Sequence, residues 1–271
     1  MGLLLDQKRY RSDHAALRNH AHAVEADCLE AARQFDSHSL SEQLEVNLAD
    51  RTDSKYLLPI RVLPRFLQGL SDEHTVLESV GHRIFTYENT YFDTPQWDLY
   101  LRHHNGNLSR HKCRFRRYHE TDMSYLEIKL KSNKLRTIKN RIPWLAEEPL
   151  QALQDEAPVV PSLYVNYRRV TLWNHATSER LTLDYDIHFR RPGQEKIVRL
   201  ADVFIAELKR EGKVYGSKFV KTAKEYGYTP HSFSKYCIGV CLTDCGALKK
   251  NRFKPMLRRL SVHSNHGELL Q

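Results

Sequence analysis

The sequence predicts an α+β protein in which a closed antiparallel β-barrel carries flanking helices. From residue 48 onward, short stretches alternate charged and apolar residues with a period of two, which is typical of strands with two distinct faces. Helical segments interrupt these strands irregularly, whereas a parallel α/β sheet needs regular alternation of strand and helix. The charged faces are mostly positive, and each has an apolar face behind it. Closure into a barrel accounts for both, with charge in the lumen and helices packed outside.

Composition and charge limit the classes of partner. With 271 residues and 41% hydrophobic content the chain can bury a full core, so disorder throughout is excluded. The net charge of +9 attracts anions, which include nucleic acid, an acidic membrane surface and phosphorylated small molecules. No apolar run approaches the roughly 20 residues of a membrane-spanning helix, although a peripheral membrane contact stays open. The odd number of scattered cysteines and the lack of a secretory signal predict a cytoplasmic protein.

Each element follows from a local pattern. Residues 1–46 are rich in Ala, His and Glu and are predicted to form a helical or loosely ordered extension. Period-two alternation predicts strands over 51–57, 112–118, 124–131, 137–142, 163–173, 180–190 and 203–210. Helical spacing or capping residues predict helices over 59–70, 97–103, 217–226 and 232–243. The main domain is predicted to span 47–245, and residues 246–271 are expected to be a basic, loosely ordered tail.

The charged strand faces suggest phosphate chemistry. Arg114 and Arg116 share one strand face, and Glu127, Lys129 and Lys131 share another. Any one such face is more often a solvated surface, but three strands carry an acid-x-Lys pair and together indicate a cationic lumen. Confined cations repel one another, so a polyanion is expected there, and guanidinium groups match phosphate oxygens. The few acids would then hold a hard divalent cation, Mn²⁺ or Mg²⁺.

Eight motifs occur in a fixed order along the chain: RTDSKY (51–56), YFDTPQWDLY (91–100), KCRFRRY (112–118), YLEIKLK (125–131), RTIKNRI (136–142), RLTLDYD (180–186), AELK (206–209) and FSKY (233–236). Taken together they resemble the catalytic domain of the vacuolar transporter chaperone (VTC) polyphosphate polymerases. This domain belongs with the triphosphate tunnel metalloenzymes, which include the CYTH phosphatases. The resemblance covers residues 48–243, and NRFKPMLR (251–258) is similar to the short bacterial members.

The resemblance implies a triphosphate tunnel fold and metal-dependent transfer of phosphate from a nucleoside triphosphate to a growing polyphosphate chain. It implies catalytic roles for Lys55, Arg114, Arg116, Lys129, Arg180 and Lys235. Further substrate-binding candidates are Lys131, Lys139, Arg141, Arg169 and Lys209, and the metal candidates are Glu207 and Glu127. CYTH phosphatases open with an E-x-E-x-K strand, whereas this chain has the single acid Asp53 before Lys55, which weighs against two-metal hydrolysis.

Several alternatives stay open at this point. A triphosphatase of the same fold and a non-catalytic polyanion-binding module are the rival functions. Nucleic acid is disfavoured, since no helix-turn-helix, zinc finger or RNP-like motif is present. Cys237, Cys241 and Cys245 are interpreted as core residues of a helix rather than zinc ligands, and Tyr91 and Tyr167 as core residues rather than adenine-stacking groups. The sequence does not indicate the oligomeric state.

Overall fold

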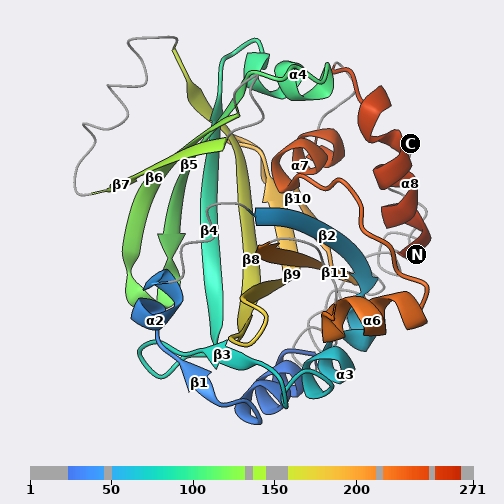
Figure 1. Ribbon diagram of the computed structural model, residues 1–271. Helices are drawn as coiled ribbons and strands as arrows, with labels where there is room; N and C mark the ends of the chain where they lie inside the picture. Colours follow the sequence, from blue (N-terminus) through green and yellow to red (C-terminus); the bar gives the residue numbers. More distant parts are fainter. Residues whose placement is uncertain are drawn as a thin grey trace, which may run out of the picture. The chain divides into compact units, whose positions relative to one another are not determined.

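The computed structural model describes residues 24–45, 51–131, 137–144, 158–211, 216–243 and 248–263. It confirms the α+β class, with a large sheet and several helices (Figure 1). The strands are β1 Ser37–His38, β2 Arg51–Pro59, β3 Thr75–Leu77, β4 Ile84–Asp93, β5 Arg110–Tyr118, β6 Met123–Lys131, β7 Thr137–Pro143, β8 Val160–Asn174, β9 Glu179–Arg190, β10 Ile197–Leu200 and β11 Val203–Glu211.

The helices are shorter and lie between or after the strands. One helix includes residues 24–33. The others are α2 Leu40–Glu45, η1 Ile60–Val62, α3 Leu63–Gln68, α4 Asp98–His104, η2 His119–Thr121, α6 Lys218–Glu225, α7 Lys235–Thr243, η3 Asn251–Phe253 and α8 Lys254–His263. Within the described ranges no helix is long and apolar enough to cross a membrane.

The main strands follow the order β2-β11-β9-β8-β4-β5-β6-β7. The pairs β2–β11, β11–β9, β4–β5, β5–β6 and β6–β7 are antiparallel, while the short pair β1–β3 is parallel. β2 and β7 stand at the two ends of this order, and no pair between described residues joins them. Closure of the sheet into a barrel therefore stays a prediction.

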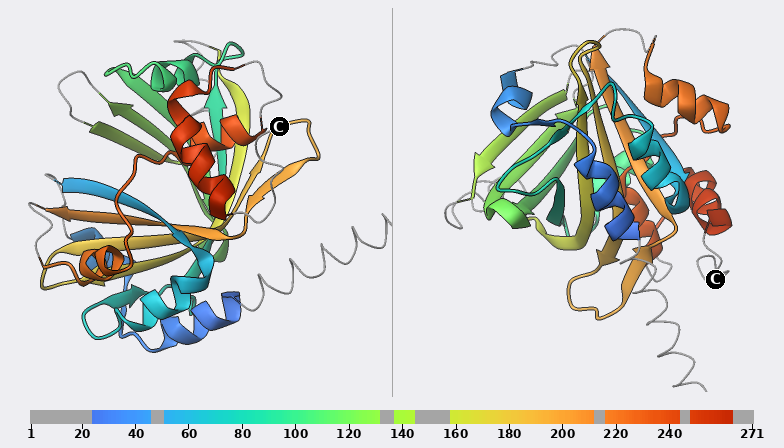
Figure 2. Two further views of the ribbon diagram at one scale, coloured as in Figure 1. Left: turned by 90° about the vertical axis from the view of Figure 1, so that its right-hand side faces the viewer. Right: turned by 90° about the horizontal axis from the view of Figure 1, so that it is seen from below.

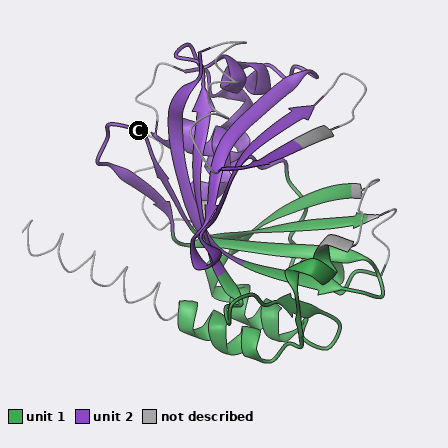
Figure 3. Ribbon diagram, turned by 90° about the vertical axis from the view of Figure 1, so that its left-hand side faces the viewer, with its two compact units in different colours: residues 1–84, 170–186, 201–231 green, residues 85–169, 187–200, 232–271 purple. Residues whose placement is uncertain are grey.

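The chain divides into two compact units (Figure 3). Unit 1 comprises residues 1–84, 170–186 and 201–231, and unit 2 comprises residues 85–169, 187–200 and 232–271. β8 and β9 each contribute residues to both units.

Unit 1 buries one face of β2, β11 and β9 beneath helices. Leu58, Phe204 and Leu181 from these strands belong to one buried cluster. In this unit the helix of residues 24–33 and α3 lie side by side (Figures 1 and 2), and their residues Cys28 and Phe66 join the same cluster. This part of the predicted extension is therefore an integral part of the core.

Unit 2 has a two-faced sheet in β4, β5 and β6. Phe92, Cys113 and Leu126 form an apolar cluster with Phe115 and Ile128 on one face. The period-two alternation of the sequence produces this face, because successive side chains of a strand point to opposite sides.

Two C-terminal helices complete unit 2. Cys237 and Cys241 of α7 are buried, as the core interpretation predicts, while Cys245 lies outside the described residues. The expectation of a loosely ordered tail was wrong for residues 254–263, which form α8. Its Met256, Leu257 and Leu260 are buried, since these apolar residues fall on one face of the helix. The predicted domain boundaries stay predictions.

Candidate functional site

The second face of the unit 2 sheet carries charged and phenolic side chains in cross-strand rows. Tyr91 of β4, Arg114 of β5, Glu127 of β6 and Arg141 of β7 stand directly opposite one another in the register. Directly opposed residues project from the same face of a sheet and are close enough to interact. Arg116 lies two residues from Arg114 and therefore belongs to the same face. The sequence prediction that these cations share a face is confirmed by the register.

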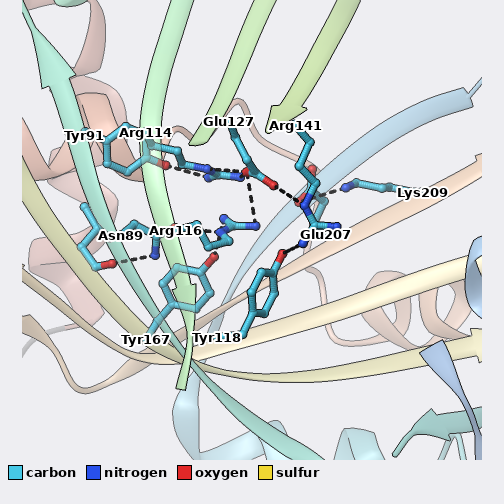
Figure 4. Close-up of polar contacts among 11 residues, drawn as sticks. Asn89, Tyr91, Arg114, Arg116, Tyr118, Glu127, Arg141, Tyr167, Glu207 and Lys209 are labelled. Atoms are coloured by element: carbon cyan, nitrogen blue, oxygen red, sulfur yellow. Dashed lines mark hydrogen bonds and ion pairs between the residues drawn. The ribbon is translucent and has the colours of Figure 1, made fainter. Parts of the chain in front are cut away.

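Glu127 is the centre of an arginine cluster. Its side chain is only 2% exposed, and its Oε2 accepts hydrogen bonds from Nε and Nη2 of Arg114 at 2.8 and 2.5 Å (Figure 4). Arg116 Nη1 lies 3.7 Å from Oε2, and Arg141 Nε lies 3.7 Å from Oε1. One negative charge thus faces three positive charges, and the cluster keeps a net positive charge.

Neutral acceptors hold the guanidinium groups in place. Arg116 donates from Nε to Asn89 Oδ1 at 2.9 Å and from Nη2 to the Tyr167 hydroxyl at 3.1 Å. Arg141 donates from Nη2 to the Tyr118 hydroxyl at 2.9 Å (Figure 4). Amide and phenol oxygens orient a guanidinium without cancelling its charge. The arrangement therefore fixes the cations and leaves their charge available to an anion.

Tyr91 shows the electrostatic effect of this cluster. Its hydroxyl accepts a hydrogen bond from Arg114 Nη1 at 3.0 Å. Burial alone would raise the pKa of Tyr91, but Arg114, Arg116 and Lys112 outweigh burial and lower this pKa below its usual value. Tyr91 and Tyr167 were expected to fill the core. Both are buried, but their hydroxyls contact Arg114 and Arg116. No signal in the sequence distinguishes such tyrosines from those that only fill a core.

The N-terminal end of α7 adds a further cation. Lys235 Nζ lies 4.6 Å from the centre of the Tyr167 ring, and the Arg169 guanidinium lies 5.2 Å from the same centre. Lys112 Nζ of β5 donates to Ser234 Oγ, directly before α7, at 2.9 Å. Lys112 was not among the sequence candidates. The signal was available, because Lys112 precedes Arg114 by two residues and so shares its face.

The remaining unit 2 candidates extend the charged face along the strands. Lys129 stands opposite Lys112, and Lys131 stands opposite Arg110. Lys139 pairs with Lys129 in the backbone register of β6 and β7.

Unit 1 contains the other predicted site residues. Lys55 of β2 and Glu207 of β11 are opposed in the register, and Lys55 Nζ donates to Glu207 Oε1 at 2.6 Å. Lys209 Nζ lies 3.8 Å from Glu207 Oε2 (Figure 4). Arg180 of β9 pairs with Lys209 in the adjacent row. Unit 1 thus brings together Lys55, Arg180, Glu207 and Lys209, whose catalytic roles stay predictions.

The two carboxylates differ in their suitability for a metal ion. Within the described part of the chain, no group of three or more His, Cys, Asp or Glu residues could hold a metal ion. Mg²⁺ is often held by one or two carboxylates together with substrate phosphates and water. Glu207, 17% exposed beside two lysines, fits this mode because phosphate oxygens could supply the other ligands. Glu127 fits it poorly, since its side chain is only 2% exposed and its Oε2 already accepts two hydrogen bonds from Arg114.

Comparisons with solved structures give matches of low identity. A proposed adenylate cyclase from Vibrio parahaemolyticus has a TM-score of 0.46 and 14% identity, covering 70% of this chain and 97% of that chain. A proposed adenylyl cyclase from Hippeastrum with a dominant triphosphatase activity has a TM-score of 0.43 and 15% identity, covering 72% of this chain and 97% of that chain. A protein from Pyrococcus horikoshii OT3 has a TM-score of 0.42 and 16% identity, covering 69% of this chain and 95% of that chain. These scores are too low to carry an argument about activity.

The family comparison covers most of the charged strands. No curated protein matches this chain. The VTC domain model matches residues 50–156 and 145–243, which include the arginine cluster of unit 2 and the Lys55–Glu207 pair of unit 1. This range agrees with the resemblance over residues 48–243. The chain therefore belongs to the VTC domain family.

Proposed function

We propose that this protein transfers the terminal phosphoryl group of a nucleoside triphosphate to a growing inorganic polyphosphate chain. Membership of the VTC domain family supports a reaction of triphosphates. The observation that carries the proposal is the arginine cluster of unit 2, in which three guanidinium groups surround one buried carboxylate and are held by neutral oxygens. Such a cluster favours a multiply charged anion over a neutral or singly charged ligand.

The reaction requires little covalent participation by the protein. A terminal oxygen of the acceptor chain attacks the γ-phosphorus of the nucleotide, and a new P–O bond forms. The bond between this phosphorus and the β–γ bridging oxygen breaks, and the nucleoside diphosphate leaves with that oxygen. Catalysis then consists of holding the two anions in line and stabilising the charge of the transferring group. Arg114, Arg116 and Lys235 are the groups that we assign to this task.

We assign the divalent cation to Glu207. When bound, Mn²⁺ or Mg²⁺ would offset phosphate charge and orient the nucleotide. Lys55 and Lys209 lie beside the Glu207 carboxylate, and phosphate oxygens held by the cation at Glu207 would lie close to these two lysines. Glu127 instead holds Arg114, Arg116 and Arg141 in position. Both assignments follow the sequence prediction of a closed barrel lined by the charged strand faces.

A cytoplasmic location accompanies this proposal. Cys28, Cys113 and Cys237 are buried free thiols, and Cys241 is also buried. Thiols stay reduced in the cytoplasm, where nucleoside triphosphates are also available.

The test is a product analysis with purified protein, ATP, Mn²⁺ and a short polyphosphate primer. The expected products are ADP and long polyphosphate resolved on a gel. ADP matched only by orthophosphate would replace this proposal with a triphosphatase. If no nucleotide is consumed with any divalent cation, a polyanion-binding module becomes the better interpretation. An Arg114→Ala variant serves as the control for contaminating activity.

A further inference from the structure

The charged face of unit 2 continues beyond the arginine cluster toward the start of β5. Two residues before Arg114, Lys112 stands opposite Lys129, and two residues earlier Arg110 stands opposite Lys131. Successive rows on one face lie about 6.8 Å apart, so these rows extend the cationic face by roughly 14 Å. The row of Arg114 contains Glu127, whereas the β5–β6 pairs of the next two rows contain only cations.

A histidine of α4 and an arginine of η3 lie at this end of the strands. Burial and the surrounding cations Lys112, Arg110, Arg252 and Lys131 lower the pKa of His103 to about 3. These cations come from β5, β6 and η3, and α4, which carries His103, packs against β5. His103 Nδ1 is also a buried atom that makes no hydrogen bond within the described residues.

Arg252 is held in this position by the last residue of α4 and the turn that follows it. Its Nη1 lies 3.4 Å from the His104 carbonyl oxygen. Gly106 has a φ of 77°, and a Cβ at this position would lie 2.3 Å from Arg252 Nη1. A glycine at 106 thus leaves the space that the guanidinium occupies. The ring of Phe253 contacts those of His103 and His104, which attaches η3 to α4.

Four cations of this end, Arg110, Lys112, Lys131 and Arg252, form no ion pair with a carboxylate in the part of the chain that the structure describes. Asp93, the acid at the end of β4, accepts hydrogen bonds from the amides of Thr94, Leu99 and Tyr100 and from the Tyr236 hydroxyl. Its charge is therefore engaged in holding α4 and α7. Clustered cations without acids repel one another, so an anion would stabilise them.

We propose that Arg110, Lys131, Arg252 and His103 form a distal polyanion subsite, linked to the arginine cluster by Lys112 and Lys129. The subsite holds phosphate units of a long chain that lie beyond those bound at Arg114. The identity of the anion as a phosphate chain rests on the proposed function, whereas the preference for a long polyanion rests on the rows of cations.

The test compares the binding of two phosphate chains without metal. Tripolyphosphate and a long polyphosphate of defined length are titrated calorimetrically into the protein and into the triple variant Arg110→Gln/Lys131→Gln/Arg252→Gln. The matched control is Lys254→Gln/Arg258→Gln/Arg259→Gln, which removes three exposed charges of α8. Melting curves establish that each variant folds, and Arg252→Gln alone replaces the triple variant if that one does not.

The expected result is a selective loss of long-chain affinity. Each exposed ionic contact contributes on the order of a factor of two to five, so the loss of three contacts should weaken the binding of long polyphosphate by about 8- to 125-fold. The affinity of the triple variant for tripolyphosphate should stay within about twofold, and the control should lose less than the triple variant. Equal losses for both ligands, an equal loss in the control, or no long-chain preference in the wild-type protein would overturn the subsite.

This test is independent of turnover. If no phosphate is transferred but the selective loss is found, the proposed function fails and the subsite stands. If polyphosphate is made and the triple variant binds it normally, the subsite fails and the function stands.

Discussion

Replacing Glu127 with glutamine should destabilise the protein and increase its dependence on a bound anion. Removing one partner of a buried ion pair costs about 3–5 kcal/mol, because the remaining charge stays buried without compensation. Glutamine keeps an oxygen that can accept a hydrogen bond from Arg114, so the lower end, about 3 kcal/mol, is expected. Each kcal/mol lowers the melting temperature of a domain of 150–250 residues by about 2–4 °C. The Tm should therefore fall by about 6–12 °C.

The assay is a thermal shift measurement without metal, with and without tripolyphosphate. Tripolyphosphate supplies the negative charge that the variant lacks. Its addition should therefore raise the Tm of Glu127→Gln more than the Tm of the wild-type protein. Glu88→Gln is the matched control, since Glu88 is 39% exposed, lies 3.8 Å from Arg117 and should change the Tm little. A Glu127→Gln protein with wild-type Tm and weakened Mn²⁺ binding would refute the positioning role and favour a metal ligand.

Three further predictions follow from individual contacts. Glu207→Gln should abolish metal-dependent turnover and leave metal-free tripolyphosphate binding nearly unchanged, whereas Arg114→Ala should weaken that binding by about 10- to 100-fold. Kinetic measurements with Mn²⁺ and calorimetric titrations without metal distinguish the two variants. Full activity of Glu207→Gln at saturating Mn²⁺ would exclude Glu207 as the metal ligand. Burial and nearby cations lower the pKa of His103 to about 3, whereas a histidine in the unfolded chain has a pKa near 6.5. Between these two pH values the unfolded chain binds more protons than the folded protein. The free energy of unfolding should therefore fall as the pH drops below about 6.5. His103→Gln should reduce the difference in urea midpoint between about pH 7.5 and about pH 5, and an unchanged difference would contradict the assigned environment. Gly239→Ala gains about 1 kcal/mol in helix propensity. It also places a Cβ 2.4 Å from Phe189 Cδ1 and 2.7 Å from Leu163 Cδ2, and such overpacking costs about 1–3 kcal/mol. Calorimetry should therefore show a lower Tm and not a higher one.

All seven strands that the sequence predicted fall within observed strands. The two faces differ most in β5 and β6, which alternate arginine, lysine or glutamate with cysteine, phenylalanine, leucine or isoleucine. β4 was not predicted as a strand. Its polar positions are Thr, Asn, Glu and Tyr rather than a run of cations, and Asn89 and Tyr91 are buried on the same side as Arg114. Because both faces of β4 have buried positions, the period-two contrast is lost.

The candidate site was predictable in its charges and not in their partners. The period-two alternation placed Arg114 and Arg116 on one face of their strand and Glu127 on the charged face of the next strand. A pattern along one strand does not reveal, however, which strands are neighbours. The pairing of β5 with β6 sets Glu127 opposite Arg114 and so changes the interpretation of this acid. Likewise, the six cations of residues 249–259 concealed the apolar residues that attach α8 to the protein.

The passage of β8 and β9 through both units has a consequence for how the chain reaches its folded state. Unit 1 is assembled from three separate segments, residues 1–84, 170–186 and 201–231, and unit 2 from the segments that alternate with them. Neither unit can therefore finish folding as it leaves the ribosome, because its last segment is synthesised after most of the other unit. The pairing of Lys55 with Glu207 alone joins residues 152 positions apart. Contacts of such separation require large loops to close first, so folding should be slow and largely post-translational.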